Sequence, residues 1–227
     1  MIAERSSDRC LAVSCSGLWL VARFDEPHAV ASWAVVGGGL GETLSVAWRH
    51  VEEHELRPPI DAAQWLKARM RENALQGAVG LLTSRRLDRW VQAQHVAGAV
   101  AANCVATVGL GNALRAGDPP GPYARIGTIN ILCRVDFALA PAALLEALAI
   151  ATEAKTAAIL ESGVASGRSG QPATGTGTDC IVIACPRAQA RASYAGKHTD
   201  VGAAIGAAVL DAVRAGALAW KAEQGLR

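Results

Sequence analysis

The sequence predicts an α/β fold of the α+β-like kind, a mixed β-sheet flanked by helices in a single domain spanning residues 1–227. Half of the residues are apolar and only 4% are aromatic, so the core must be aliphatic, with helices and strands packed closely. Short apolar runs bounded by turn residues alternate with longer helical patterns. Two polar segments each precede a strand, and a shared site would gather those strand starts at one sheet edge, which favours a mixed sheet over a doubly wound one.

The first third of the chain begins with a predicted strand meander. Its apolar runs cover 11–15, 18–24 and 29–36. A glycine cluster then leads into a helical pattern near 42–56, which Pro58-Pro59 would stop. Asp61 with Gln64 three residues later forms a capping-box signal, which predicts a helix to about Asn73.

The remaining elements follow from the same apolar patterns and turn signals. They are a strand at 78–83, a helix at 85–95, a β-like run at 96–108, a long loop at 109–127, a strand at 128–136, a helix at 141–162, a glycine-rich loop at 163–178, a strand at 180–185 and a helix at 199–219. The loop at 109–127 is long for a compact domain, which is typical of a functional segment.

Charge and cysteine content exclude several classes of protein. The 22 basic and 20 acidic residues nearly cancel, and no basic run predicts a nucleic-acid or membrane partner. The six cysteines lack zinc-knuckle spacing and are expected to be free thiols. No segment is expected to be long and apolar enough to span a bilayer, and the predicted location is cytoplasmic.

The strand at 128–136 alternates, so Thr128 and Asn130 share one face and the aliphatic residues share the other. This polar face is either part of a site or an ordinary solvated face.

In the following helix, Lys155 falls inside the apolar arc, whereas Glu153 falls on the opposite side. A buried lysine needs a carboxylate, a carbonyl or a ligand beside it, unless its stem carries the charge out to solvent.

The segment from Thr174 to Asp179 alternates threonine and glycine. If extended, it would point three hydroxyl groups to one side and Asp179 to the other. A phosphate loop is a weak interpretation, because this loop follows a helix and leads into a strand.

Further along, His198 precedes Thr199, a candidate N-cap, and a helix amino terminus favours the neutral imidazole of a general base. The alternative is a surface histidine beside a cap.

Familiar hydrolase and metal motifs are absent from the sequence. It contains neither a Gly-x-Ser-x-Gly elbow nor His-Glu-x-x-His. His50 and His54 have a metal-compatible spacing on the predicted helix, but their charged neighbours favour an exposed face. No protein-bound metal is therefore predicted.

Five segments together resemble the signature segments of the adenosylcobinamide amidohydrolase family. They are VGLGNALRAGD (108–118), GTINI (127–131), ATEAKTAA (151–158), ATGTGTD (173–179) and YAGKHT (194–199). Their order and spacing agree with the family over roughly the last 120 residues, and the first 75 residues agree more loosely.

The resemblance implies hydrolysis of the amide that joins aminopropanol to a corrin ring propionate, a step of corrinoid salvage. The corrinoid is then a small-molecule substrate, its cobalt belongs to the substrate, and no cofactor is expected. It also implies site residues. The catalytic candidates are His198, Asp179, Lys155 and Glu153, and the substrate-binding candidates are Asn112, Thr128, Asn130, Gly175, Thr176, Gly177, Thr178 and Lys197.

Within that set, His198 is expected to act as general base or acid, with Asp179 orienting it or a water molecule. Lys155 or Lys197 would stabilise the oxyanion. The nucleophile stays open between water and a threonine hydroxyl such as Thr128 or Thr178. Glu153 enters through the resemblance, although helical periodicity argues against it.

Two other functions stay open at this point. One is a corrinoid-binding or carrier protein without hydrolytic activity, and the other is a nucleotide-dependent transferase that uses residues 163–179 as a phosphate loop. Assembly into a homo-oligomer is also compatible with the sequence.

Overall fold

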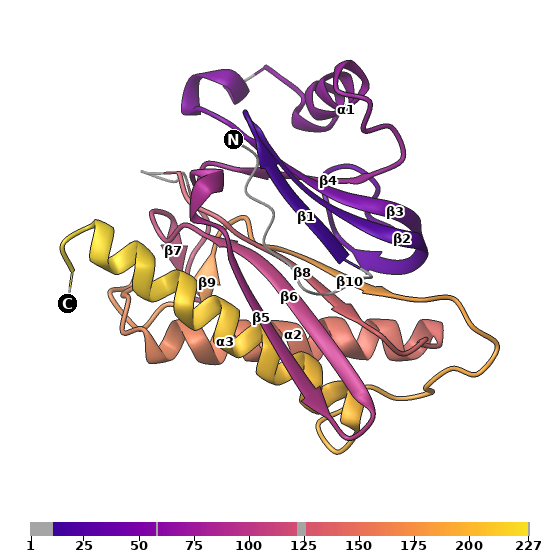
Figure 1. Cartoon of the computed structure of the whole chain (residues 1–227). Coiled ribbons are helices and arrows are strands. Elements are labelled where there is room, and N and C mark those ends of the chain that lie inside the picture. The colour runs from indigo at the N-terminus through magenta and orange to yellow at the C-terminus, as the bar shows by residue number, and fades with distance from the viewer. Residues whose placement is uncertain (1–10, 58, 122–125, 227) are drawn as a thin grey trace.

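A computed structural model describes residues 11–57, 59–121 and 126–226 (Figure 1). Pro58, Cys10 (one of the six cysteines) and residues 122–125 of the predicted loop at 109–127 lie outside these ranges. The described part contains a mixed sheet of eight strands flanked by helices, so the predicted fold class is confirmed. The strand order is β4-β3-β2-β10-β8-β6-β5, and β1 pairs with β2 beside this path.

The sheet strands and α-helices have the following bounds. They are β1 Leu11–Ser16, β2 Trp19–Ser32, β3 Gly39–His50, α1 Ala62–Glu72, β4 Val79–Thr83, β5 Val91–Ala97, β6 Val100–Val108, β8 Ile129–Val135, α2 Pro141–Glu161, β10 Cys180–Cys185 and α3 Asp200–Glu223. A separate two-stranded sheet pairs β7 (Ala113–Leu114) with β9 (Gly175–Thr176). Short 3-10 helices cover Glu53–Leu56 and Leu87–Arg89.

The long strand β2 joins the two halves of the sheet. Its first half pairs with β1, its second half pairs with β10, and β3 runs along its other side. The sequence predicts two strands here, separated at Asp25-Glu26-Pro27. They are continuous instead, because the pairing with β3 shifts register between Arg23 and His28 and accommodates the proline in that irregularity.

Two predicted helices are wrong. The segment near 42–56 forms β3 and a short 3-10 helix, and the segment 85–95 forms a 3-10 helix and β5. In each case a neighbouring strand supplies the backbone partners. β3 lies between β2 and β4, and β5 forms an antiparallel hairpin with β6. Tertiary pairing overrides the weak helical pattern of a short amphipathic segment.

The other helices begin where their capping residues predict. The Asp61 carboxylate accepts hydrogen bonds from the backbone of Ala63 and Gln64 at the start of α1. Pro141 occupies the first turn of α2. The Thr199 hydroxyl accepts from Gly202 N at 3.0 Å, so it caps α3 as predicted.

The sheet bends, so its N-terminal strands lie over its C-terminal strands, while α2 and α3 cover the opposite face (Figure 1). Residues of β1 to β4 form one core with Val105, Leu132 and Val182 of β6, β8 and β10. The helices form a second core on the other side of these strands, built from many alanines. As a result every residue of β8 is buried, including the polar Asn130 and Arg134.

Helix α3 (Asp200–Glu223) is long and apolar enough to cross a membrane by length and composition, contrary to the expectation that no segment is. Its buried residues pack against β5, β6 and α2. Gly216 allows this helix to approach the sheet, because an added Cβ would collide with Val108. In this structure α3 is a core helix.

Candidate active site

A pocket of about 340 Å³ opens where β8 and β10 begin. Most of its wall is aliphatic and comes from the N-terminal strands and their connections. The polar lining includes four of the predicted substrate-binding residues, namely Asn112, Thr128, Asn130 and Thr178. The structure therefore brings together side chains from three segments that are far apart in the sequence.

The polar face of β8 is not a solvated face. Thr128 and Asn130 are both buried beneath the N-terminal strands. The side-chain amide of Asn130 donates to Leu82 O of β4 at 2.7 Å, across the two halves of the sheet. Further along the same face, Arg134 donates to His28 Nε2 at 3.0 Å. Burial lowers the pKa of His28, and its Nδ1 lies 2.9 Å from Glu26 O. The polar side chains of β8 on this buried face, Asn130 and Arg134, each have a specific partner, as burial requires.

Two threonine hydroxyls fasten the Thr178 turn to the start of β8. The Thr128 hydroxyl donates to Thr178 O at 2.8 Å, and the Thr178 hydroxyl donates to Gly127 O at 3.1 Å. Gly127 is required here because an added Cβ would lie within 3 Å of the backbone nitrogens of Gly111 and Asn112. This contact brings the loop around Asn112 against the start of β8.

The loops that carry Asn112 and Thr178 are joined by the small β7–β9 sheet. Ala113 pairs with Thr176, and Gly177 N donates to Asn112 O at 3.3 Å. At Gly177, an added Cβ would lie 2.9 Å from the Asn112 side-chain nitrogen. The absence of a side chain at Gly177 therefore leaves room for the Asn112 amide at the pocket.

The segment from Thr176 to Asp179 is a turn, so its side chains do not alternate as they would in an extended run. Thr176 ends β9, and its hydroxyl donates to Asp179 Oδ1 at 2.5 Å. The Thr176 backbone N–H also donates to the Asp179 carboxylate, at 3.1 Å. Threonine and aspartate therefore point toward each other, because hydrogen bonds within the turn outweigh the period-two pattern.

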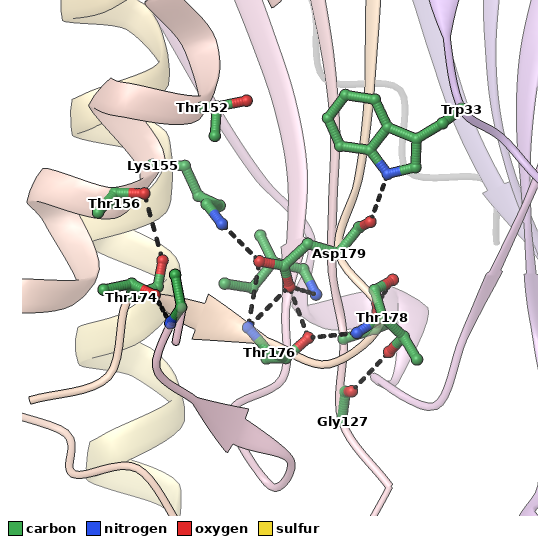
Figure 2. A network of polar contacts seen from close by, with 12 residues as sticks. Trp33, Gly127, Thr152, Lys155, Thr156, Thr174, Thr176, Thr178 and Asp179 are labelled. Carbon is green, nitrogen blue, oxygen red and sulfur yellow. Dashed lines mark hydrogen bonds and ion pairs between the residues drawn. The ribbon is translucent and has the colours of Figure 1, made fainter. Parts of the chain in front are cut away.

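Asp179 also forms a buried ion pair with Lys155 of α2, shown in Figure 2. Lys155 Nζ donates to Asp179 Oδ2 at 2.6 Å, and the two side chains are 9% and 10% exposed. Ile129 N donates to Asp179 Oδ1 at 3.2 Å. The carboxylate thus ties together the turn, the start of β8 and α2. The predicted need of Lys155 for a partner is confirmed.

Gly175 allows the ion pair to form. An added Cβ at this position would collide with both Asp179 Oδ2 and Lys155 Nζ. In the sequence, the glycines of this segment are expected to allow a ligand or a strand to approach. At Gly175 the approaching group is the lysine of the neighbouring helix.

The ion pair lies behind the pocket rather than in its wall. Thr178 and Cys180 line the pocket, whereas the side chain of Asp179 between them reaches toward α2. Figure 2 shows Lys155 on one side of Asp179 and the indole of Trp33 on the other. The position of Lys155 and Asp179 suits them to hold the polar end of the pocket in place.

The other predicted catalytic residues lie elsewhere. Helix α3 begins beside Gly98, in the turn between β5 and β6. That turn is next to the end of β8, because Ala102 of β6 pairs with Val135. His198 is therefore at the opposite end of β8 from Thr128, and its side chain is exposed. Of the two roles expected for Asp179, orienting His198 finds no support in this geometry, because Lys155, Thr176 and Ile129 contact the carboxylate instead.

Glu153 and Lys197 form an ion pair with each other, at 2.5 Å between Glu153 Oε2 and Lys197 Nζ. Their side chains are 57% and 69% exposed. The prediction that Glu153 and Lys155 point in different directions is confirmed, and α2 needs no distortion to explain it. Neither Glu153 nor Lys197 lines the pocket.

The thiol of Cys180 is an unsuitable nucleophile. Burial raises its pKa to about 11, so at neutral pH the thiol keeps its proton. The five cysteines in the described residues are free, as expected. Within the same described ranges, no group of three or more histidine, cysteine or acidic side chains has the arrangement of a metal site.

Several pocket residues are missing from the sequence prediction because they belong to the N-terminal half. Val35 and Leu82 line the pocket, and Trp33 lies beside it with its indole N–H donating to Asp179 O at 2.7 Å. Ile126, from the end of the predicted loop at 109–127, also lines the pocket and was not predicted. One feature of the sequence could have pointed to Trp33: it is an aromatic residue just before a glycine cluster, in a chain with few aromatic residues. The other N-terminal residues could not be found from the sequence, because the bend of the sheet decides which strands lie over the pocket.

Comparisons with known proteins extend over most of the chain. The sequence profile of the adenosylcobinamide amidohydrolase family matches residues 5–225. A curated adenosylcobinamide amidohydrolase from Halobacterium salinarum is 41% identical over 117 residues, an alignment that covers 48% of this chain and 47% of the relative. The aligned region thus spans about half the length of that relative.

Two solved structures have a similar arrangement at low identity. A beta-aminopeptidase from Burkholderia sp. gives a TM-score of 0.44 with 12% identity, over 94% of this chain and 88% of that one. The L-aminopeptidase D-Ala-esterase/amidase of Ochrobactrum anthropi also gives 0.44 with 12% identity, over 95% and 81%.

Proposed function

The chain belongs to the adenosylcobinamide amidohydrolase family, and we propose that it hydrolyses the amide between aminopropanol and the corrin ring of adenosylcobinamide. The products are adenosylcobyric acid and aminopropanol, and the reaction serves corrinoid salvage. The observation that carries the proposal is the convergence of Asn112, Thr128, Asn130 and Thr178 at one end of an otherwise aliphatic pocket.

An amide needs a nucleophile, a stabilised oxyanion and a protonated leaving amine. We assign the attack to Thr128, because its buried hydroxyl lies at the pocket and two residues before Asn130. The Thr128 oxygen forms a bond to the amide carbon, the C–N bond breaks, and the hydroxyl proton leaves with the amine. Water then cleaves the resulting ester, which yields the carboxylic acid and restores Thr128.

The polar residues around Thr128 orient the amide. Among the described residues, the Asn112 side chain has no hydrogen-bond partner, and we assign its amide group to the substrate carbonyl oxygen. Asn130 is held by Leu82 O, and Thr178 is held by Gly127 O. Lys155 and Asp179 are positioning residues in this scheme, because they fasten the turn that carries Thr178 to α2.

The direct test incubates the purified chain with adenosylcobinamide and measures released aminopropanol, with and without a metal chelator. Release of aminopropanol supports the proposal. Binding of the corrinoid without release would contradict it and would favour a carrier protein.

Two substitutions of Thr128 test whether this residue is the nucleophile. Thr128→Ala should lower kcat by at least about 10²-fold, whereas Thr128→Ser should retain measurable activity. Thr152→Ala is the matched control, because the Thr152 hydroxyl donates to Leu148 O within α2, away from the pocket. In the Thr128→Ser variant, a transient mass increase equal to the corrinoid acyl group would show the covalent ester. If Thr128→Ala keeps kcat within about three-fold, Thr128 is not the nucleophile, and the attack passes to water or to Thr178.

A further inference from the structure

Three large apolar side chains that are substantially exposed lie in the pocket wall or next to it. Trp33 is 49% exposed, Val35 is 40% exposed and Ile126 is 39% exposed. Val35 and Ile126 also line the pocket. We call these three residues the apolar rim. Single exposed apolar residues are normal on a protein surface, but a group around one pocket marks a binding surface.

The pocket is too small for a whole corrinoid. Its volume of about 340 Å³ is near the lower limit of the roughly 300–1,000 Å³ that accommodates a drug-sized ligand. Adenosylcobinamide has a macrocycle and an axial adenosyl group and is much larger than such ligands. The pocket can therefore admit an arm of the substrate but not the ring.

The orientation of that arm follows from where the polar groups are. Asn112, Thr128 and Asn130 lie at the polar end of the pocket, which is where the reacting amide must be. The ring to which the arm is attached then remains outside, against the mouth. We propose that the face or edge of the corrin macrocycle lies on the apolar rim, an inference that rests on the proposed function.

Trp33 is prepared for such a contact. Its indole N–H donates to Asp179 O at 2.7 Å, so the ring plane is fixed while nearly half of the residue stays exposed (Figure 2). A fixed aromatic surface loses little conformational entropy when a ligand binds. The same residue, Asp179, anchors the Thr178 turn, so the rim and the polar end of the pocket are held in one arrangement.

The experiment separates binding of the ring from hydrolysis of the arm. Adenosylcobyric acid contains the ring without aminopropanol, and its Kd is measured by equilibrium dialysis with the corrin absorbance as readout. Trp33→Ala and Ile126→Ser should each weaken binding by at least about ten-fold, and Trp33→Phe, which keeps a ring but loses the hydrogen bond, should weaken it less. Leu44→Ala is the matched control, since Leu44 is 54% exposed and does not line the pocket.

Unchanged Kd values in Trp33→Ala and Ile126→Ser would overturn the proposal, and so would a wild-type chain that does not bind adenosylcobyric acid. Circular dichroism of each variant confirms that it is folded. Hydrolysis of adenosylcobinamide is measured in parallel on the wild-type chain. If no aminopropanol is released while ring binding still depends on Trp33, the proposed hydrolysis is wrong. The proposal that the apolar rim binds the corrin ring is then still supported.

Discussion

Two ion pairs of the same chemical kind lie at different depths in this protein. Lys155–Asp179 joins α2 to the start of β10 with side chains 9% and 10% exposed, whereas Lys197–Glu153 joins the segment before α3 to α2 with side chains 69% and 57% exposed. The resemblance treats all four residues alike, as candidates for the site. Burial separates them, because an ion pair in water contributes little and a buried one is costly to break.

The surroundings of the pairs differ as much as their exposure. Asp179 accepts further hydrogen bonds from Thr176 and from Ile129 N, so its carboxylate is the centre of a network. Glu153, by contrast, is paired with Lys197 at the surface and does not line the pocket. The comparison indicates that the first pair shapes the pocket and that the second is a feature of the surface.

The largest expected effect is on the buried pair. Asp179→Ala should lower the free energy of unfolding by about 3–5 kcal/mol, because it leaves the Lys155 charge buried without its carboxylate. Lys155→Met should cost less, since Asp179 keeps its donors from Thr176 and Ile129. Urea unfolding followed by circular dichroism measures both. A loss below about 1 kcal/mol for Asp179→Ala would show that the pair is not the anchor described here.

A smaller effect is expected from crowding the same pair. Gly175→Ala should destabilise the protein by about 1–3 kcal/mol, because the added methyl group occupies the space where Lys155 meets Asp179. Gly41→Ala is the matched control, since no atom lies within 4 Å of its added Cβ. Thermal unfolding of the two variants provides the measurement, and equal Tm values would contradict the crowding.

The catalytic effect of His198→Ala should be smaller still. His198 is exposed and lies at the other end of β8 from Thr128, so kcat/KM for adenosylcobinamide should stay within about three-fold of wild type. Aminopropanol release at several substrate concentrations tests this. A loss of 10²-fold or more would restore His198 as the general base and would require the segment around it to move.

The smallest effect is expected at the exposed pair. Glu153→Gln and Lys197→Met should each change the free energy of unfolding by no more than about 0.5 kcal/mol, and added salt should reduce the difference further. A double-mutant cycle on each pair, in urea at two salt concentrations, compares their coupling energies directly. Equal coupling energies would remove the distinction between the two pairs.

The long helices could be predicted from the sequence because their signals are local. Pro141 and Thr199 mark the starts of α2 and α3, and their apolar residues recur over several turns. The regions near 42–56 and 85–95 could not be assigned in this way. Their identity as β3 and β5 depends on strands β2, β4 and β6, which supply the backbone hydrogen bonds.

The candidate site shows the same division. Thr128, Asn130 and Thr178 are identifiable from their motifs, and the anomaly of a lysine in an apolar arc correctly indicates that Lys155 has a buried partner. The motifs do not show that Thr176 turns back to Asp179. They also do not show that Trp33 and Leu82 contact the site from the other half of the sheet.

By itself the sequence determined the mixed character of the fold, the caps of the helices, the alternation of β8 and the family to which the chain belongs. These properties depend on neighbouring residues or on motifs that can be read in order. The tertiary structure decided which polar residues share a pocket, because the bend of the sheet places β4 over β8 and the β5–β6 turn beside α3. Depth from solvent is a property of the whole fold, and it is what separates Lys155–Asp179 from Lys197–Glu153.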